Sequence, residues 1–156
     1  MNIIPLKEKY KYQVIKLLDR NTEYHMSINK EFSRFISNEY PDYNDMNTKE
    51  VNNDDNKFII AVDKDEVLGF ILYKDRGEYI SISDFFTKPE VRGQGIGIKL
   101  MDYVTNSFKG KHIELRCLKD NTLALNFYLK YGFKIIREDK GRMYKIDDYI
   151  LSYENK

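Results

Sequence analysis

The sequence predicts one α/β domain, in which a mixed, mostly antiparallel sheet of about seven strands is flanked by about four helices. Three observations support this fold class. Strand-like runs follow one another between residues 58 and 86 with short turns between them, as in an antiparallel meander. From residue 96 onward, apolar residues at helical spacing alternate with strand-like runs. The length of 156 residues suits one domain, and a hydrophobic content of 42% is enough to bury a core.

The first third of the chain is predicted to hold a short strand and two helices. A strand at residues 3–5 precedes an apolar pattern that predicts a first helix over residues 10–18. The polar pair Asn21-Thr22 predicts a break, after which a second helix runs to residue 40. Residues 41–56 are polar and rich in turn-forming residues, so we expect a loop there with at most a brief helical turn.

The rest of the chain is predicted to supply the remaining strands and two further helices. The strands are expected at residues 58–62, 67–73, 79–86, 113–118, 133–137 and 142–146. One helix is expected over residues 96–108 and another over residues 122–131, which Gly132 ends. In the second of these helices, an inward stripe is expected to hold Ala124, Leu125, Tyr128 and Leu129.

Composition excludes several classes of protein. The net charge of +1 argues against a general nucleic-acid binder, which usually has a strong basic excess. The single cysteine, Cys117, excludes an internal disulfide framework. No apolar run approaches the roughly 20 residues of a membrane span, and the first residues do not resemble a signal peptide. We therefore expect a cytoplasmic protein without a membrane partner.

The segment Arg92-Gly93-Gln94-Gly95-Ile96-Gly97 is the strongest chemical signal. It lies between a predicted strand and a predicted helix, where glycine amides and the helix N-terminus can bind a phosphate or pyrophosphate. It is not a P-loop, because no Lys-Ser/Thr follows it. A dinucleotide fingerprint would need glycine at position 98, where the chain has isoleucine. A glycine-rich turn without a ligand stays open as the alternative.

This segment resembles the Arg/Gln-x-x-Gly-x-Gly/Ala signature of the GNAT superfamily of acetyl-CoA-dependent N-acetyltransferases. Residues 121–133 independently resemble a second family pattern, Asn-x-x-Ala-x-x-Phe-Tyr-x-x-x-Gly-Phe, with one residue of slack. The predicted order of elements fits this family over nearly the whole chain. The resemblance implies a single N-acetyltransferase domain over residues 1–156, with a GNAT-like fold, acetyl-CoA as co-substrate and no metal.

The resemblance also implies a set of coenzyme contacts. The amides of the glycine loop would hold the pyrophosphate, and the preceding strand would pair with the pantetheine arm. The residues assigned to coenzyme binding in this way are Phe86, Thr87, Arg92, Gly93, Gln94, Gly95, Ile96, Gly97, Asn121 and Asn126. For the two asparagines, a helix cap and a solvated helix face are the respective alternatives.

The implied reaction is acyl transfer from a thioester to an amine, which requires a proton acceptor for the amine and a donor for the leaving thiolate. Tyr128 matches the motif tyrosine of the family, and we assign it as the general acid. A phenol is neutral at pH 7 and can donate a proton or a hydrogen bond to sulfur. Tyr131 is the rival, but it lies off the motif.

Asp84 is the candidate that binds the ammonium form of the amine or accepts its proton. If strand alternation is unbroken, Asp84 shares its face with Ile80, Ile82 and Phe86, and this apolar surrounding would raise its pKa. The segment around it, Ser83-Asp84-Phe85-Phe86, resembles a Glu-Asp-Phe-Phe-type segment of spermidine/spermine N-acetyltransferases, with serine in place of the first acid.

The predicted acceptor is a primary amine of a small molecule or peptide. The acidic residues Glu23, Glu31 and Asp42 fall where the family shapes its acceptor pocket, with solvated surface charge as the alternative. The resemblance also allows a homodimer formed through the last strands. Three other functions stay open: a catalytically silent acyl-CoA sensor, a transferase that uses another acyl-CoA donor, and a nucleotide-binding module.

Overall fold

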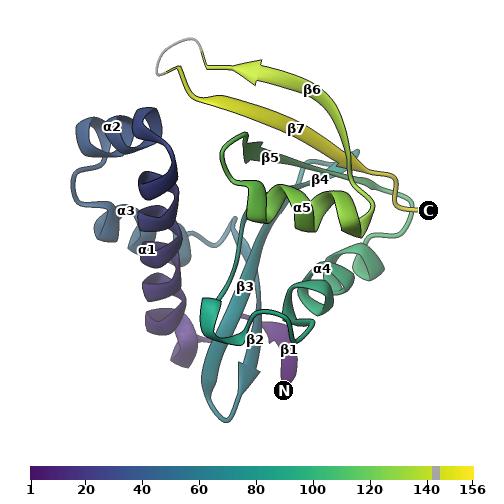
Figure 1. Cartoon of the computed structure of the whole chain (residues 1–156). Helices are drawn as coiled ribbons and strands as arrows, with labels where there is room; N and C mark the ends of the chain where they lie inside the picture. The colour runs from purple at the N-terminus through teal and green to yellow at the C-terminus, as the bar shows by residue number, and fades with distance from the viewer. Residues whose placement is uncertain (142–144) are drawn as a thin grey trace.

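In the computed structural model of the chain, seven strands form one mixed sheet with helices packed on both faces (Figure 1). The structure describes residues 1–141 and 145–156. The strands are β1 (Asn2–Pro5), β2 (Lys57–Asp63), β3 (Glu66–Asp75), β4 (Tyr79–Thr87), β5 (His112–Leu118), β6 (Lys134–Lys140) and β7 (Asp147–Tyr153). Their order in the sheet is β1-β2-β3-β4-β5-β7-β6, and every neighbouring pair is antiparallel except β4 and β5.

Within the described residues five α-helices surround this sheet, which confirms the predicted fold class with one helix more than expected. They are α1 (Lys11–Ile28), α2 (Lys30–Glu39), α3 (Tyr43–Asn52), α4 (Ile96–Ser107) and α5 (Thr122–Tyr131). Two short 3₁₀ helices, at Glu8–Tyr10 and Pro89–Val91, precede α1 and the glycine loop. None of the described helices combines the length and the apolar character needed to cross a membrane.

The two faces of the sheet carry separate apolar cores, because successive residues of each central strand point to opposite sides. The core under α4 and α5 includes Ile59, Ile71, Leu100, Met101, Val104 and Leu151. The core under α1 includes Val14, Leu17, Phe58, Ile60, Phe70 and Leu72. The functional site lies where these two layers of helices approach each other across β4.

The predicted break at Asn21-Thr22 is wrong, because α1 continues through both residues. The Thr22 hydroxyl donates to the Leu18 carbonyl at 3.0 Å, so this polar side chain is satisfied inside the helix. The helix ends instead at Asn29, whose side chain accepts a hydrogen bond from the Phe32 amide and caps α2.

The loop predicted for residues 41–56 is also wrong, because ten of its residues form α3. Asp42 caps this helix by accepting a hydrogen bond from the Asp45 amide at 3.1 Å. The buried carboxylate of Asp19 on α1 accepts hydrogen bonds from Asn44 at 2.7 Å and Asn47 at 2.8 Å. These long-range polar contacts hold a helix whose polar composition resembles that of a loop.

The last predicted strand needs a correction as well. Residues 142–144 of the predicted 142–146 lie outside the described part of the chain, and residues 145 and 146 are not in a strand. β7 begins at Asp147, where its pairing with β6 and with the buried β5 starts. Ile150 and Leu151 of β7 are buried in the sheet and explain this placement.

Candidate active site

A bulge in β4 marks the position of the site. Leu72 of β3 pairs with Asp84, but the next residue, Tyr73, pairs with Ile82, so Ser83 is an extra residue in β4. The parallel pairing of β4 with β5 also ends at Ile82. Beyond the bulge, β4 and β5 form no further backbone hydrogen bonds with each other, and a space opens between them that side chains and a ligand can occupy.

The bulge also redirects the side chains of β4. Ile80, Ile82 and Phe85 belong to the core under α4 and α5, whereas Phe86 belongs to the core under α1. Asp84 contacts α1, because Asn21 of that helix donates to its carboxylate at 2.5 Å. The prediction that Asp84 shares a face with Ile80 and Ile82 is therefore wrong, since it assumed unbroken alternation.

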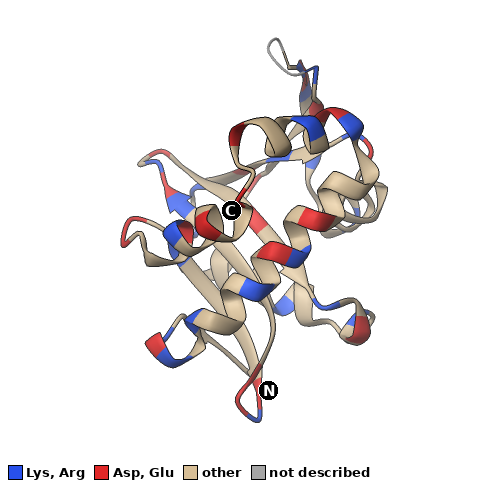
Figure 2. Ribbon diagram, turned by 90° about the vertical axis from the view of Figure 1, so that its left-hand side faces the viewer, with Lys and Arg blue, Asp and Glu red and all other residues tan. Residues whose placement is uncertain are grey.

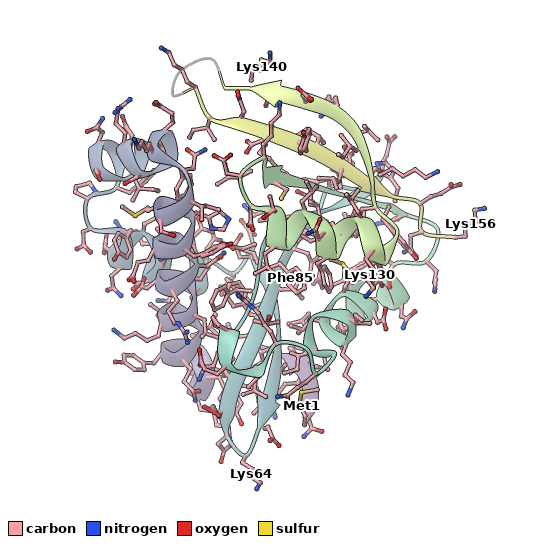
Figure 3. All side chains as sticks on the ribbon, viewed as in Figure 1. Met1, Lys64, Phe85, Lys130, Lys140 and Lys156 are labelled. Atoms are coloured by element: carbon pink, nitrogen blue, oxygen red, sulfur yellow. The ribbon has the colours of Figure 1, made fainter. Side chains whose placement is uncertain are left out.

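A pocket of about 420 Å³ occupies this space. Residues of α1, of the glycine loop and of α5 line it, as does Phe85 of β4, which Figure 3 labels. Its lining residues are Asn21, Tyr24, Phe85, Phe86, Thr87, Val91, Arg92, Gly93, Gly95, Ile96, Gly97, Ile98, Asn121, Leu123, Ala124, Phe127, Tyr128 and Lys130. Most of the residues predicted to bind coenzyme thus meet in one pocket.

The glycine loop forms one end of the pocket and suits an anion. Gly95, with φ of 79°, is the N-cap of α4 and provides no side-chain cap, so the first amides of the helix stay open to a ligand. Gly97 is required by packing, because an added Cβ would lie 3.1 Å from the Phe127 ring and 3.2 Å from the Phe85 ring. Arg92 adds a positive charge, although burial lowers its pKa.

Arg92 shares an aromatic partner with a second arginine. The guanidinium carbon of Arg92 lies 5.6 Å from the centre of the Phe86 ring, and that of Arg20 lies 5.9 Å from it. Arg20 also forms an ion pair with Glu90 at 2.6 Å. Positive charge therefore gathers at the loop end of the pocket, next to a smaller cavity of about 280 Å³ that Tyr24 and Phe86 also line.

Tyr128 also lines the pocket and is buried. Burial raises its pKa far above the ordinary range of a phenol, so it carries its proton at neutral pH. Among the described residues none forms a hydrogen bond with its hydroxyl, which leaves the donor available to a ligand. The hydroxyl of Tyr131, by contrast, is held by Asp102 at 2.7 Å and Thr105 at 3.1 Å.

Asp84 is half-buried and its pKa is raised to about 6. Burial is the main cause, whereas the nearby His25 and the Asn21 hydrogen bond oppose the shift. The direction predicted from the sequence is confirmed, but the surroundings that cause it are different. Asp84 does not itself line the pocket, and Asn21, which holds it, does.

The remaining predicted positions have mixed surroundings. Asn121 is buried, lines the pocket and caps α5 by accepting a hydrogen bond from the Ala124 amide at 3.2 Å. Gln94 and Asn126 are exposed and do not line the pocket. Cys117 lies in the core, where burial raises the pKa of its thiol to about 12. The predicted inward position of Leu129 is wrong, since that side chain is 43% exposed.

The three acidic residues proposed for an acceptor region have partners in the fold. Glu23 accepts a hydrogen bond from Tyr43, Glu31 pairs with Arg34, and Asp42 caps α3. Figure 2 shows acidic and basic residues interspersed along the ribbon, in keeping with the net charge of +1. No group of three or more His, Cys, Asp or Glu side chains within residues 1–141 and 145–156 is placed to hold a metal ion.

Sequence reasoning missed the residues that α1 contributes. Asn21 and Tyr24 line the pocket, and His25 contacts Asn121, another residue of its lining. A signal was present, because Leu17, Asn21 and His25 are spaced by four and lie on one face of an uninterrupted helix. The predicted break after residue 20 concealed this spacing.

The fold and the glycine loop match one known family of proteins. The sequence pattern of the acetyltransferase (GNAT) family matches residues 21–133, and the chain belongs to this family. A curated relative is the peptidyl-lysine N-acetyltransferase YjaB of Salmonella typhimurium strain LT2, which is 33% identical over 93 residues. That alignment covers 57% of this chain and 60% of the relative, so it spans less than two thirds of the relative's length.

Solved structures show the same fold over the full chain. The apo form of YjaB from Escherichia coli superimposes with a TM-score of 0.73 at 18% identity, covering 99% of this chain and 98% of that one. An aminoglycoside 6'-N-acetyltransferase complexed with coenzyme A superimposes with a TM-score of 0.70 at 18% identity, covering 100% of this chain and 98% of that one.

Proposed function

We propose that this protein transfers an acetyl group from acetyl-CoA to a primary amine of a small molecule or peptide, with Tyr128 as the general acid. The observation that carries the proposal is the unpartnered, protonated hydroxyl of Tyr128 in the same pocket as the glycine loop. A loop that suits a phosphate and a proton donor that line the same pocket fit a thioester with an anionic part and a reacting part.

In the proposed reaction the amine nitrogen attacks the thioester carbonyl directly, so the new C–N bond forms and the C–S bond breaks without an enzyme-bound intermediate. Asp84, near the pocket and ionised above pH 6, holds the ammonium form or accepts its proton. Tyr128 donates its hydroxyl proton or a hydrogen bond to the sulfur as the thiolate leaves. The amides from Gly93 to Gly97 and the Arg92 guanidinium hold the pyrophosphate.

The acceptor class is supported by what the relatives act on. YjaB is a peptidyl-lysine N-acetyltransferase, and the structural neighbour bound to coenzyme A acts on aminoglycosides. Both kinds of acceptor present a primary amine. The predominantly apolar pocket, with Phe85 and Phe127 against Tyr128, supports a site that excludes water from the thioester.

The test is thiol release from acetyl-CoA over a panel of amines that includes a lysine peptide, a polyamine and an aminoglycoside. We expect release with at least one amine, and a large loss of turnover in Tyr128→Phe. No thiol release with any amine, despite measurable coenzyme binding, would favour an acyl-CoA sensor. Tighter binding of NAD than of coenzyme A in calorimetry would overturn the assignment, and faster turnover of a longer acyl-CoA would change the donor.

A further inference from the structure

The imidazole of His25 lies between α1 and the first turn of α5, and its hydrogen bonds define its protonation state. Nδ1 lies 2.7 Å from the backbone carbonyl oxygen of Asn21. A carbonyl oxygen only accepts hydrogen bonds, so Nδ1 carries a hydrogen and donates it. The state of the ring therefore depends on its other nitrogen, Nε2.

Nε2 of His25 lies 3.4 Å from Nδ2 of Asn121. The orientation of the Asn121 amide is fixed independently, because its Oδ1 accepts the hydrogen bond from the Ala124 amide that caps α5. Its Nδ2 group therefore faces His25 and can only donate. This contact requires an unprotonated Nε2, which means a neutral ring.

Through these bonds His25 joins the two elements that hold the proposed catalytic groups. Asn21, one turn before His25 on α1, donates its side-chain amide to Asp84. Asn121 caps α5, the helix that carries Tyr128. One further hydrogen bond, from Asn29 to Asp120 at 3.0 Å, crosses between the same two regions.

We propose that neutral His25 is a positioning residue for acetyl transfer. Its hydrogen bonds to Asn21 and Asn121, here called the His25 tie, hold α1 and Asp84 against the N-terminus of α5, the helix that carries Tyr128. A proton on Nε2 would break the hydrogen bond to Asn121. The inference rests on the proposed function, because it assigns a purpose to the spacing of Asp84 and Tyr128. His25 does not contact the reacting atoms in this scheme.

Protonation breaks the contact for a geometric reason. A protonated Nε2 would present its N–H to the N–H₂ of Asn121, and turning the Asn121 amide would remove the α5 cap. The charged groups around the ring are Asp84 on β4, with Glu50 of α3 acting on Asp84, and Asp120 beside Asn121. The other neighbours of the ring are the aromatic side chains of Tyr24 and Phe32.

Two substitutions distinguish the effect of the His25 hydrogen bonds from the effect of its packing contacts. His25→Phe keeps a ring against Tyr24 and Phe32 but removes both hydrogen bonds. His25→Gln keeps one donor and one acceptor without a titrating group. His112→Phe and His112→Gln are the matched controls, because the other histidine is exposed, stacks on Tyr79 and pairs with Glu114 away from the pocket.

We expect His25→Phe to lower kcat roughly 10- to 100-fold, as displaced catalytic groups do, while the coenzyme Kd stays within about twofold. His25→Gln should recover most of this loss. Below pH 6, log(kcat/KM) of the natural protein should fall, because Asp84 must be ionised. The His112 variants should match the natural protein in kcat and in coenzyme Kd.

Imidazole ¹⁵N NMR provides a readout that does not need activity. In His112→Gln the remaining histidine signals belong to His25, and we expect protonated Nδ1 and unprotonated Nε2 at neutral pH. A dominant Nε2–H tautomer, an unchanged kcat in His25→Phe, or a kcat of His25→Gln as low as that of His25→Phe would each overturn the proposal. If Asp84→Asn and Tyr128→Phe keep full activity, the proposed function itself fails. If these two variants are inactive while His25→Phe has normal activity, only the positioning role of His25 is refuted.

Discussion

Replacing Asp84 by asparagine should stabilise the protein at neutral pH while it impairs catalysis. The carboxylate is half-buried, its pKa is raised to about 6, and burial is the main cause. The folded state therefore holds an ionised Asp84 at pH 7 at a cost in free energy. Asparagine at this position carries no charge and can still accept the hydrogen bond from Asn21.

The sign and the size of the expected change in folding stability follow from proton linkage. Between the unfolded pKa, near 3.8, and the folded pKa of about 6, the folded state binds more protons than the unfolded state. The stability contributed by the protonated group is fully present below the lower value and is lost as the pH rises through the higher one. A shift of about two units at 1.36 kcal/mol each makes this loss at most about 3 kcal/mol.

The assay is urea unfolding of both proteins at several values between pH 4 and pH 7.5. The advantage of Asp84→Asn over the natural protein should grow with pH and level off above pH 7. Asp75→Asn, followed down to pH 2, is the control of sign, because hydrogen bonds from Gly77 and Lys111 lower the pKa of that carboxyl. Its stabilising effect is present above the unfolded value of 3.8 and should be lost only as the pH falls below that value. A stability difference for Asp84→Asn that does not change with pH would refute the reasoning.

Other variants test the remaining parts of the site. Tyr128→Phe should lower turnover more than tenfold with little change in coenzyme affinity, whereas Tyr131→Phe should keep turnover; equal effects in kinetic assays would remove Tyr128 as the acid. Gly95→Glu should abolish coenzyme binding in calorimetry, because it places a like charge at the phosphates, and normal binding would contradict the loop assignment. Gly97→Ala should cost about 1–3 kcal/mol in urea unfolding, because its Cβ meets the Phe127 ring, and an unchanged midpoint would show that the ring can move.

The strands of the middle of the chain could be predicted because their signals are local. The run from Phe58 to Val62 is apolar without interruption, and the structure buries it on both faces of the sheet. The same locality explains α5, whose cap at Asn121 and end at Gly132 are both visible in the sequence.

The helices of the N-terminal region could not be predicted in the same way, because long-range contacts decide them. α3 is polar, and its helical state depends on hydrogen bonds from Asn44 and Asn47 to a carboxylate about 25 residues earlier in the chain. α1 continues past residue 20 because Thr22 is satisfied within the helix and Asn21 finds Asp84 on a distant strand. Neither partner is visible at the level of local propensity.

The candidate site likewise has residues that local sequence patterns predict and residues that depend on distant contacts. The glycine loop and Tyr128 belong to compact sequence patterns, and the structure places both in one pocket. The surroundings of Asp84 depend on the bulge at Ser83, which no local pattern announces. His25 belongs to no motif in the sequence, and its proposed role can be inferred only from its contact with Asn121 in the structure.

One inserted residue accounts for the geometry of the whole site. Without the bulge at Ser83, alternation would place Asp84 on the face of Ile80 and Ile82, under α4 and α5. With it, Asp84 turns toward α1 and Phe85 toward α5. β4 also leaves β5 at the same position, so the pocket opens where the carboxylate and the phenol come from opposite sides. The net charge of +1 therefore conceals local charge at the site, with Arg92 in the glycine loop and the perturbed carboxylate of Asp84 held by a residue that lines the pocket.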